Sequence, residues 1–504
     1  MESEAGSTST TSLDNGLTCV LRLQDQPPLW RQRPGFQTLM QIVLEQQVSL
    51  ASALNPIMDL GLARRPTDSV TELLVDSSQL TLIAFRKGTA LDPYTTAISL
   101  HSHTCHSNEV LTAVSPYIAR IPIVARLFHN ETDAYQRRTG LSVDFSKGWW
   151  HPPLTPAAVI ESEVLQIETV LECASIVSVT DHDRIDAVLE LQESHGPELA
   201  PISFEWTVPL KLGFLHLGVH NLRSADAPYV FHDLAAYTCS SKRPDLAELS
   251  RLLVELNADP EVLVVLNHPL WDISDIGATN HFENVNRFVA DHGDLIHAFE
   301  LNGYRCQQEN REVVELANTC QLPIVSGGDR HGRTPNSVLN LTNATSFGQF
   351  AREIRNEKRS VILLMPEYRR ALVDRKLKTA SDVLRTYPTH PAGRQRWNDR
   401  VTYERHGIVR PLAERWPTGG PFWVRATIMA FQLATSPAFL PLTGAVARFF
   451  QRIPWTRHVG QSHSPSTSQR RSQPIPLHAR SRVNNSSLSS GQADHRARSL
   501  ASRE

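Results

Sequence analysis

The chain has 504 residues, 41% of them hydrophobic, which is more than one hydrophobic core usually fills and predicts two or three structural units. Its formal net charge of −2 excludes a strong attraction of the whole molecule to nucleic acid or to an acidic membrane. The six cysteines lie far apart without a C-x-x-C pair, which argues against a zinc ribbon or a disulfide framework and favours a reducing, cytoplasmic setting.

The N-terminal region divides into two segments. Residues 1–16 are polar and acidic, unlike a signal peptide, and are predicted to be disordered. Within residues 17–60, apolar side chains such as Phe36, Met40 and Leu44 recur at helical spacing, so this segment is predicted to be helical.

From Ala97 onwards, short apolar runs alternate with helical stretches, which indicates βα units and a parallel sheet or barrel. We place this domain at residues 97–376, with an insertion at about 110–153 that is marked by proline and aromatic residues. A helical extension is predicted for residues 377–455. Residues 456–504 are rich in serine and arginine with almost no aromatic residues, and a disordered tail is predicted there.

The extension contains the most apolar late stretch of the chain, "ATIMAFQLATSPAFLPLTGAVARFF". Pro437 and Pro441 interrupt it, so we expect one or two buried helices and no stable insertion into a membrane. A helix lying at a membrane interface is the alternative.

Seven apolar runs of the 97–376 domain deliver an imidazole or a carboxylate at or near their C-terminal end. In chain order these residues are His101 and His103; Asp181, His182 and Asp183; Glu205; His216 and His220; His268; His297 and Glu300; and Asp329 and His331. The C-terminal ends of parallel strands share one face, where active sites are built. Burying so many ionisable groups without a partner would be costly, and metal ions supply the partner. The set exceeds what one tetrahedral ion needs, so two or three divalent ions of Zn, Mn or Fe are implied.

The order of "LHSHT", "SVTDHD", "FEW", "LHLG", "NHP" and "GGDRH" resembles the polymerase and histidinol phosphatase (PHP) family of metal-dependent phosphoesterases. The resemblance covers about Ile98 to Met365 and implies an α/β fold, a distorted, TIM-like seven-stranded β/α barrel with up to three divalent ions at its C-terminal mouth. Carried over to this sequence, the implied metal ligands are His101, His103, His182, Glu205, His216, His268, Asp329 and His331. Asp181 is implied as a partner behind His182.

One element of the family pattern differs. Many relatives have Ser-Asp-Gly shortly after the first motif, whereas this chain has Ser107-Asn108-Glu109. Asn108 or Glu109 replaces the aspartate, or Asp144 folds back to supply the carboxylate, or one metal position is weakened.

Three arginines stand beside ligand motifs: Arg184, Arg330 and Arg333. They could hold phosphate oxygens, or they are charges at the barrel rim. We assign catalytic roles to Glu205, Asp181 and Arg330. His106, His220 and His297 are expected to be core histidines or to lie behind the ligands.

A second resemblance concerns "GFQTLMQIVLEQQVSLASA", which is similar to a helix of helix-hairpin-helix DNA-3-methyladenine glycosylases. The glycine-containing hairpin and the catalytic aspartate of such enzymes do not follow. The segment is either a glycosylase-like fragment without an active site or an ordinary amphipathic helix.

The prediction is therefore a hydrolase that cleaves a phosphoester by a metal-bound hydroxide. Its partner would be a small phosphorylated substrate, with a nucleotide or an oligonucleotide end as candidates. The alternatives are a metal-binding barrel with weakened catalysis, and a DNA-binding or repair-related protein.

Overall fold

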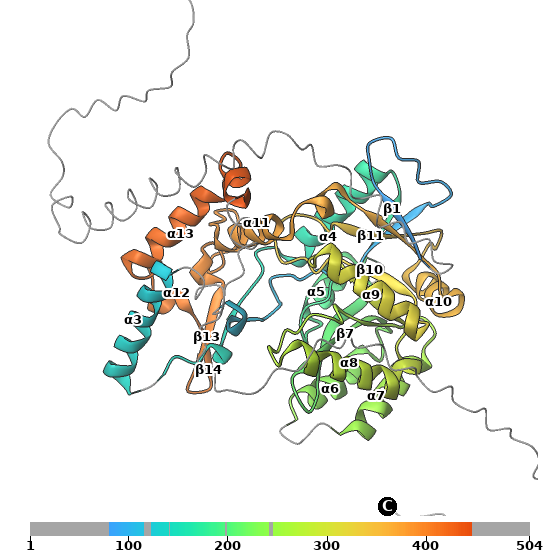
Figure 1. The fold of residues 1–504 in the computed structure, drawn as a ribbon, viewed down its shortest axis with the longest axis horizontal. Coiled ribbons are helices and arrows are strands. Elements are labelled where there is room, and N and C mark those ends of the chain that lie inside the picture. The colour runs from blue at the N-terminus through green and yellow to red at the C-terminus, as the bar shows by residue number, and fades with distance from the viewer. Residues whose placement is uncertain (1–79, 115–121, 141, 197–198, 241–244, 446–504) are drawn as a thin grey trace, which may run out of the picture. The chain divides into compact units, whose positions relative to one another are not determined.

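The computed structural model describes residues 80–114, 122–140, 142–196, 199–240 and 245–445 (Figure 1). All of them belong to one of the chain's two compact units, Met1–Phe450. The segments expected at 1–16, 17–60 and 456–504 lie outside the described residues, so those expectations remain predictions.

The described strands form three sheets. The first has the order β1 (Leu80–Ala84), β12 (Ser360–Leu364), β11 (Val338–Thr342), β2 (Thr96–Ser99) and β5 (Ala174–Val177). The second has the order β10 (Ile324–Gly327), β9 (Ala298–Asn302), β8 (Leu263–Leu266), β7 (Phe214–Leu222) and β6 (Ile202–Pro209). The third contains β14 (Ile408–Pro411), β13 (Val401–Arg405), β4 (Gly148–Trp150) and β3 (Glu109–Val110).

Helices connect and cover these strands. The α-helices are α3 (Pro122–Thr139), α4 (Pro156–Gln166), α5 (Asp186–His195), α6 (Ala227–Thr238), α7 (Leu246–Ala258), α8 (Ala278–His292), α9 (Gln307–Cys320), α10 (Phe347–Glu357), α11 (Leu372–Leu384), α12 (Leu412–Arg415) and α13 (Phe422–Ala434). Short 3-10 helices occupy Leu111–Val114, Phe145–Lys147, Gly293–Leu295, Pro366–Arg369 and Trp397–Asp399, and a π-helical turn follows α4 at Ile167–Leu171.

The sequence explains how the second sheet is buried between helices. All four residues of β8, "LVVL", are apolar and buried, as expected of a strand covered on both faces. On α7, Leu249, Leu252 and Leu256 lie on the buried stripe. The carboxylate of Asp245 accepts the backbone N–H groups of Ala247 and Glu248 and caps the start of that helix.

A single closed seven-stranded barrel is not detected in the described part of the chain, so the expected fold is confirmed only as a mixed α/β architecture. The two five-stranded sheets meet at isolated bridges, Ser102 with Arg330 and His182 with Glu205. Three of these four residues lie beyond the strand ends, where short backbone hydrogen bonds such as His103 N–H to the Arg330 carbonyl (2.9 Å) connect the sheets. The segments that carry the predicted ligands are therefore also the segments that join the sheets.

The expectation of a parallel sheet is wrong for two strands. In the first sheet, β11 runs antiparallel to both β12 and β2. In the second sheet, the exception is β7. This strand runs antiparallel to both β6 and β8, because β6 and β7 form a hairpin in which Thr207 faces His216. A residue near the start of an antiparallel strand lies at the same edge as the C-terminal ends of its neighbours. His216 thus reaches the common edge from the beginning of β7, whereas His220 lies farther along the strand.

Residues 377–455 were expected to form a separate helical extension. The described part up to residue 445 contains α12 and α13, but it is neither wholly helical nor separate. The segment contains β13 and β14, and β13 pairs antiparallel with β4 of the 110–153 insertion, with Thr402 facing Trp149. The extension and the insertion therefore share one sheet, in which β13 and β14 lie side by side (Figure 1).

The apolar stretch of this extension forms α13, which has no buried residue, so the expectation of a buried helix is wrong. No helix of the described residues is long and apolar enough to cross a membrane.

Candidate metal centre

The backbone of three predicted ligands adopts a positive φ that non-glycine residues rarely take. The φ angles are 61° at His101, 28° at His268 and 52° at Asp329. Each of these residues lies two positions after the end of a buried strand, namely β2, β8 and β10. Such conformations are held only where surrounding structure enforces them, and they cluster at functional sites.

The first group of side chains surrounds one oxygen of Glu205. Its Oε2 atom lies 3.2 Å from His101 Nε2 and 3.4 Å from His103 Nε2. The two Nε2 atoms are 3.1 Å apart. Asp329 Oδ1 lies 3.7 Å and 3.5 Å from the same two nitrogens. All four residues are buried.

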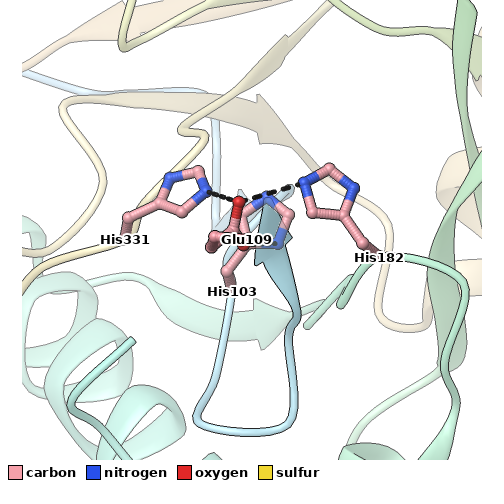
Figure 2. A group of neighbouring side chains, drawn as sticks. All are labelled: His103, Glu109, His182 and His331. Atoms are coloured by element: carbon pink, nitrogen blue, oxygen red, sulfur yellow. Dashed lines mark ion pairs between the residues drawn. The ribbon is translucent and has the colours of Figure 1, made fainter. Parts of the chain in front are cut away.

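The second group is built around Glu109 at the start of β3 (Figure 2). Its Oε2 atom lies 3.4 Å from His182 Nε2 and 3.2 Å from His331 Nε2. His103 belongs to the same group, and its ring stacks on that of His331 with centroids 4.2 Å apart. Of the alternatives left open by the sequence, Glu109 is thus the carboxylate that reaches the histidines. Asp144 instead is exposed and accepts a hydrogen bond from the backbone N–H of Ser146, 3.0 Å away.

The third group surrounds the other oxygen of Glu205. Its Oε1 atom lies 3.2 Å from His216 Nδ1 and 3.1 Å from His268 Nε2, and those two nitrogens are 3.4 Å apart. The structure therefore brings all eight predicted ligands together, and adds Glu109 to them.

Two observations indicate that these groups of side chains could bind divalent ions. Ligands bound at about 2.0 to 2.1 Å around a tetrahedral zinc lie about 3.3 Å apart, close to the separations found here. In addition, the buried Oε2 atom of Glu205 accepts no hydrogen bond from any described residue, although three imidazoles surround it. A buried carboxylate oxygen in this position needs a cation.

The electrostatics of the cluster point the same way. Burial opposes ionisation of Glu205, but the imidazoles of His101, His216 and His182 outweigh it and hold its pKa well below the usual range. Burial also opposes ionisation of Glu109, but His331 and His182 keep its pKa low. Burial, assisted by His331, lowers the pKa of His103 to about 3, so this ring is neutral and able to bind a metal.

A second layer of side chains holds the ligands in place, and its central member, Glu300, was not predicted to have this role. Glu300 in β9 lies behind His101, with its Oε1 atom 2.5 Å from His101 Nδ1. Its Oε2 atom accepts the backbone N–H of His268 at 2.8 Å and an amide N–H of Asn302 at 2.8 Å. Asn267 donates to Glu205 Oε1 at 3.0 Å. The position of Glu300 at the end of an apolar run was the only available signal.

The role expected for Asp181 behind His182 is wrong. Its carboxylate accepts hydrogen bonds from the backbone N–H and the hydroxyl of Thr104, at 2.5 and 2.6 Å. Burial raises the pKa of Asp181 to about 6, although these bonds oppose the shift. Asp181 therefore anchors the loop that follows His103 and contacts no ring nitrogen of His182 in the described structure.

The phosphate-binding role expected for Arg330 is also wrong. Its guanidinium is buried and donates to Glu163 at 2.6 Å and to the carbonyls of Gly332 and Arg333 at 3.1 and 3.0 Å. Glu163 in turn accepts the backbone N–H of Asn336. These bonds hold the segment after His331 in place. The Arg330 guanidinium therefore has a structural role and is not free to bind a phosphate.

The remaining expected residues lie outside the groups. Arg184 forms an exposed ion pair with Asp186, and Arg333 lies over the Tyr387 ring. Among the other histidines, His106 pairs with Glu190, and His220 contacts the Ser178 hydroxyl. His297 accepts the backbone N–H of Val264, as expected of a core histidine.

Comparison with known proteins found similar structures but no similar sequence family. No family model matches the sequence, and no curated protein matches it. Among solved structures, the chain is similar to an amidohydrolase from Chromobacterium violaceum with bound sulfate and no metal, at 15% identity over 36% of this chain and 83% of that chain, with a TM-score of 0.24. It is also similar to a protein assigned as a metal-dependent phosphoesterase from Bifidobacterium adolescentis, at 15% identity over 40% of this chain and 91% of that chain, with a TM-score of 0.25. Likeness at these TM-scores carries no weight for function, which is argued below from the side chains.

Proposed function

We propose that this protein is a metal-dependent hydrolase that cleaves a phosphoester, with two or three divalent ions held by the clustered histidines and carboxylates. The observation that carries the proposal is the position of Glu205. Its Oε2 faces His101 and His103, and its Oε1 faces His216 and His268, so one carboxylate addresses two groups of imidazoles. A bridging carboxylate is the arrangement that a two-metal site requires.

Each group would hold one ion. The ion of the first group would be bound by His101, His103, Glu205 and Asp329. The ion of the second group would be bound by Glu109, His182 and His331, and that of the third group by Glu205, His216 and His268. Divalent ions at such positions activate water for attack on phosphorus and stabilise charge on the phosphoryl oxygens. The two five-stranded sheets, joined at the ligand segments, would together form the scaffold of this site.

Other residues of the protein orient the metal-binding histidines and keep the cluster buried. Glu300 orients His101 through its Nδ1 atom and fixes the His268 backbone, so both rings keep one orientation. The neutral state of His103 leaves a lone pair available. Burial of Glu205 and Asp329 lowers the local dielectric response and strengthens every charge interaction in the cluster.

Aromatic rings border the cluster and favour a nucleotide or an oligonucleotide end as the substrate. The ring centroid of Trp271 lies 5.1 Å from that of His268, and Trp150 lies 5.7 Å from His331. Both tryptophans are half-buried. The Arg305 guanidinium lies over one face of Trp271, 4.4 Å from the ring centroid, so a base could stack only on the opposite face of that ring. Bases stack on such rings with little dependence on sequence.

Hydrolysis of a panel of phosphomonoesters and phosphodiesters tests the proposal, with manganese, zinc or iron supplied to the full-length protein. Inorganic phosphate is measured for the monoesters, and the released alcohol is measured for the diesters. Wild type should turn over at least one class. Glu205→Gln should lower kcat by at least about 100-fold, because one bridging charge is removed. His232→Ala, an exposed histidine on α6, is the matched control and should retain full activity. Metal binding without turnover on any ester would favour the catalytically weakened alternative.

The alternative of a DNA-binding or repair protein rests on residues 17–60 and on the basic tail, which lie outside the described residues.

A further inference from the structure

One face of α13 exposes large apolar side chains. Phe422, Met429 and Leu433 are 68%, 69% and 61% exposed. Their spacing of seven and four residues places all three on the same side of a helix. Arg425 is also exposed and lies one turn before Met429 on this side. We call this set of four residues the α13 face.

Other sides of α13 are attached to the protein. Trp423 donates to Glu131 of α3, and Gln432 donates to the Leu384 carbonyl at the end of α11. These two bonds hold the helix in place, and the side chains of the α13 face remain exposed.

The apolar surface continues beyond the helix. Phe439 and Leu442 are 48% and 56% exposed, and residues 440–445 are helical. Arg425 is the only charged residue between Pro421 and Ala445. Five large exposed apolar side chains in one short segment that contains no acidic residue are unusual for a surface that meets water alone.

The sequence that follows is strongly basic. Residues 446–504 contain ten arginines, no lysine and two acidic residues, a formal charge of +8. Because the whole chain has a formal charge of −2, the first 445 residues carry −10. Positive charge is thus concentrated in the part of the chain that directly follows the exposed apolar surface.

We propose that α13 and the basic segment after it dock the protein on an anionic membrane surface. Such a surface offers an apolar interior for the α13 face, Phe439 and Leu442, and phosphate or carboxylate headgroups for the arginines. A nucleic acid offers the anions but no apolar interior, so it leaves the α13 face unexplained. The two signals together give reversible attachment, which neither gives alone.

Co-sedimentation of the full-length protein with vesicles tests this proposal. Vesicles of phosphatidylcholine alone are compared with vesicles that also contain phosphatidylserine. Binding should require phosphatidylserine and should fall steeply between 0.1 and 1 M salt, where the screening length shortens from about 10 to about 3 Å. The double substitution Met429→Glu and Leu433→Glu should weaken binding at least about tenfold.

A matched control separates docking from a general effect of charge. Leu246 and Val254 on α7 are 53% and 55% exposed, and the double substitution Leu246→Glu and Val254→Glu makes the same chemical change on another helix. This control should bind vesicles as wild type does. Replacing Arg470, Arg471, Arg480 and Arg482 by glutamine should also weaken binding and flatten its dependence on salt.

Three results would overturn the proposal. The first is equal binding by wild type and by the Met429→Glu, Leu433→Glu protein. The second is an α13 face that forms dimers in solution, with vesicles not bound. The third is a basic segment that binds duplex DNA in the vesicle assay buffer while anionic vesicles are not bound.

Discussion

Glu300 acts on the cluster through its neighbours. Its carboxylate reaches His101 Nδ1 at 2.5 Å and the backbone of His268 at 2.8 Å. Glu300→Gln keeps the shape of the side chain but removes its charge, so His101 loses basicity and orientation. We expect metal affinity to fall by about 10- to 100-fold in a chelator-competition titration.

Glu190→Gln provides the control for that substitution. Glu190 pairs with His106, a histidine outside the three groups, and its side chain is exposed. Metal affinity should not change in this variant. If Glu300→Gln also leaves the affinity unchanged, the orienting role of Glu300 is refuted.

The pH dependence of the chelator-treated protein follows from Glu109. Burial lowers the pKa of His182 and His331, but Glu109 outweighs it and raises them to about 10 and about 9. A histidine whose pKa rises on folding stabilises the protein fully below its unfolded value of about 6.5 and loses that contribution as the pH rises through its folded value. The melting temperature should therefore fall between pH 7 and pH 10.

Glu109→Gln should remove most of this fall, because the charge that raises both pKa values is gone. The comparison is a pair of melting curves recorded across the same pH range. An equally steep decline in the glutamine variant would show that other groups cause it.

At the scale of elements, the sheet of β3, β4 and β13 holds Glu109 in position. Arg394, which precedes β13, donates to the Cys105 carbonyl at 2.5 Å and to its sulfur at 3.0 Å, in the loop between His103 and Glu109. Arg394→Met should lower the free energy of unfolding by about 2 kcal/mol, since hydrogen bonds from a charged group are lost.

Urea unfolding of Arg394→Met and of Arg410→Met measures this effect. Arg410 lies in β14 and forms an exposed ion pair with Glu414, so its substitution should cost about 0.5 kcal/mol or less. Equal losses in the two variants would contradict the special role of the contact with Cys105.

The sequence predicted the elements unevenly, for physical reasons. Buried strands such as β8 and amphipathic helices such as α7 carry their own patterns. The strand β13 does not, because it is short, only half-buried and paired with β4, which lies about 250 residues earlier. The antiparallel direction of β7 likewise depends on the hairpin with β6 rather than on any local pattern.

Whether a side chain points into the site also depends on contacts with residues that are far away in the sequence. The eight predicted ligands converge because the ends of buried strands meet, which the order of motifs predicts. Arg330 follows Asp329 directly but turns to Glu163, 167 residues away in sequence. The sequence alone offered Glu109 only as one of several candidates for the missing carboxylate. Its position depends on the pairing of β3 with β4 in the insertion, which no local pattern predicts.

At the scale of the whole molecule, attachment and chemistry should be separable. All the described members of the clusters lie between His101 and His331. Deleting residues 1–60 or the tail after Thr456 should leave phosphate release in solution largely unchanged. Deleting the tail should also weaken vesicle binding, and both properties can be measured on one preparation. A tail deletion that abolishes phosphate release would contradict this separation.

The metal content of the purified protein tests the central claim most directly. Elemental analysis of wild type, Glu205→Gln and His232→Ala would count divalent ions per chain. We predict two or three ions in wild type and in the His232 variant, and at least one fewer in Glu205→Gln, since Glu205 faces two groups of histidines. A wild-type protein that binds no divalent ion, or a Glu205→Gln protein with an unchanged metal count, would contradict the account.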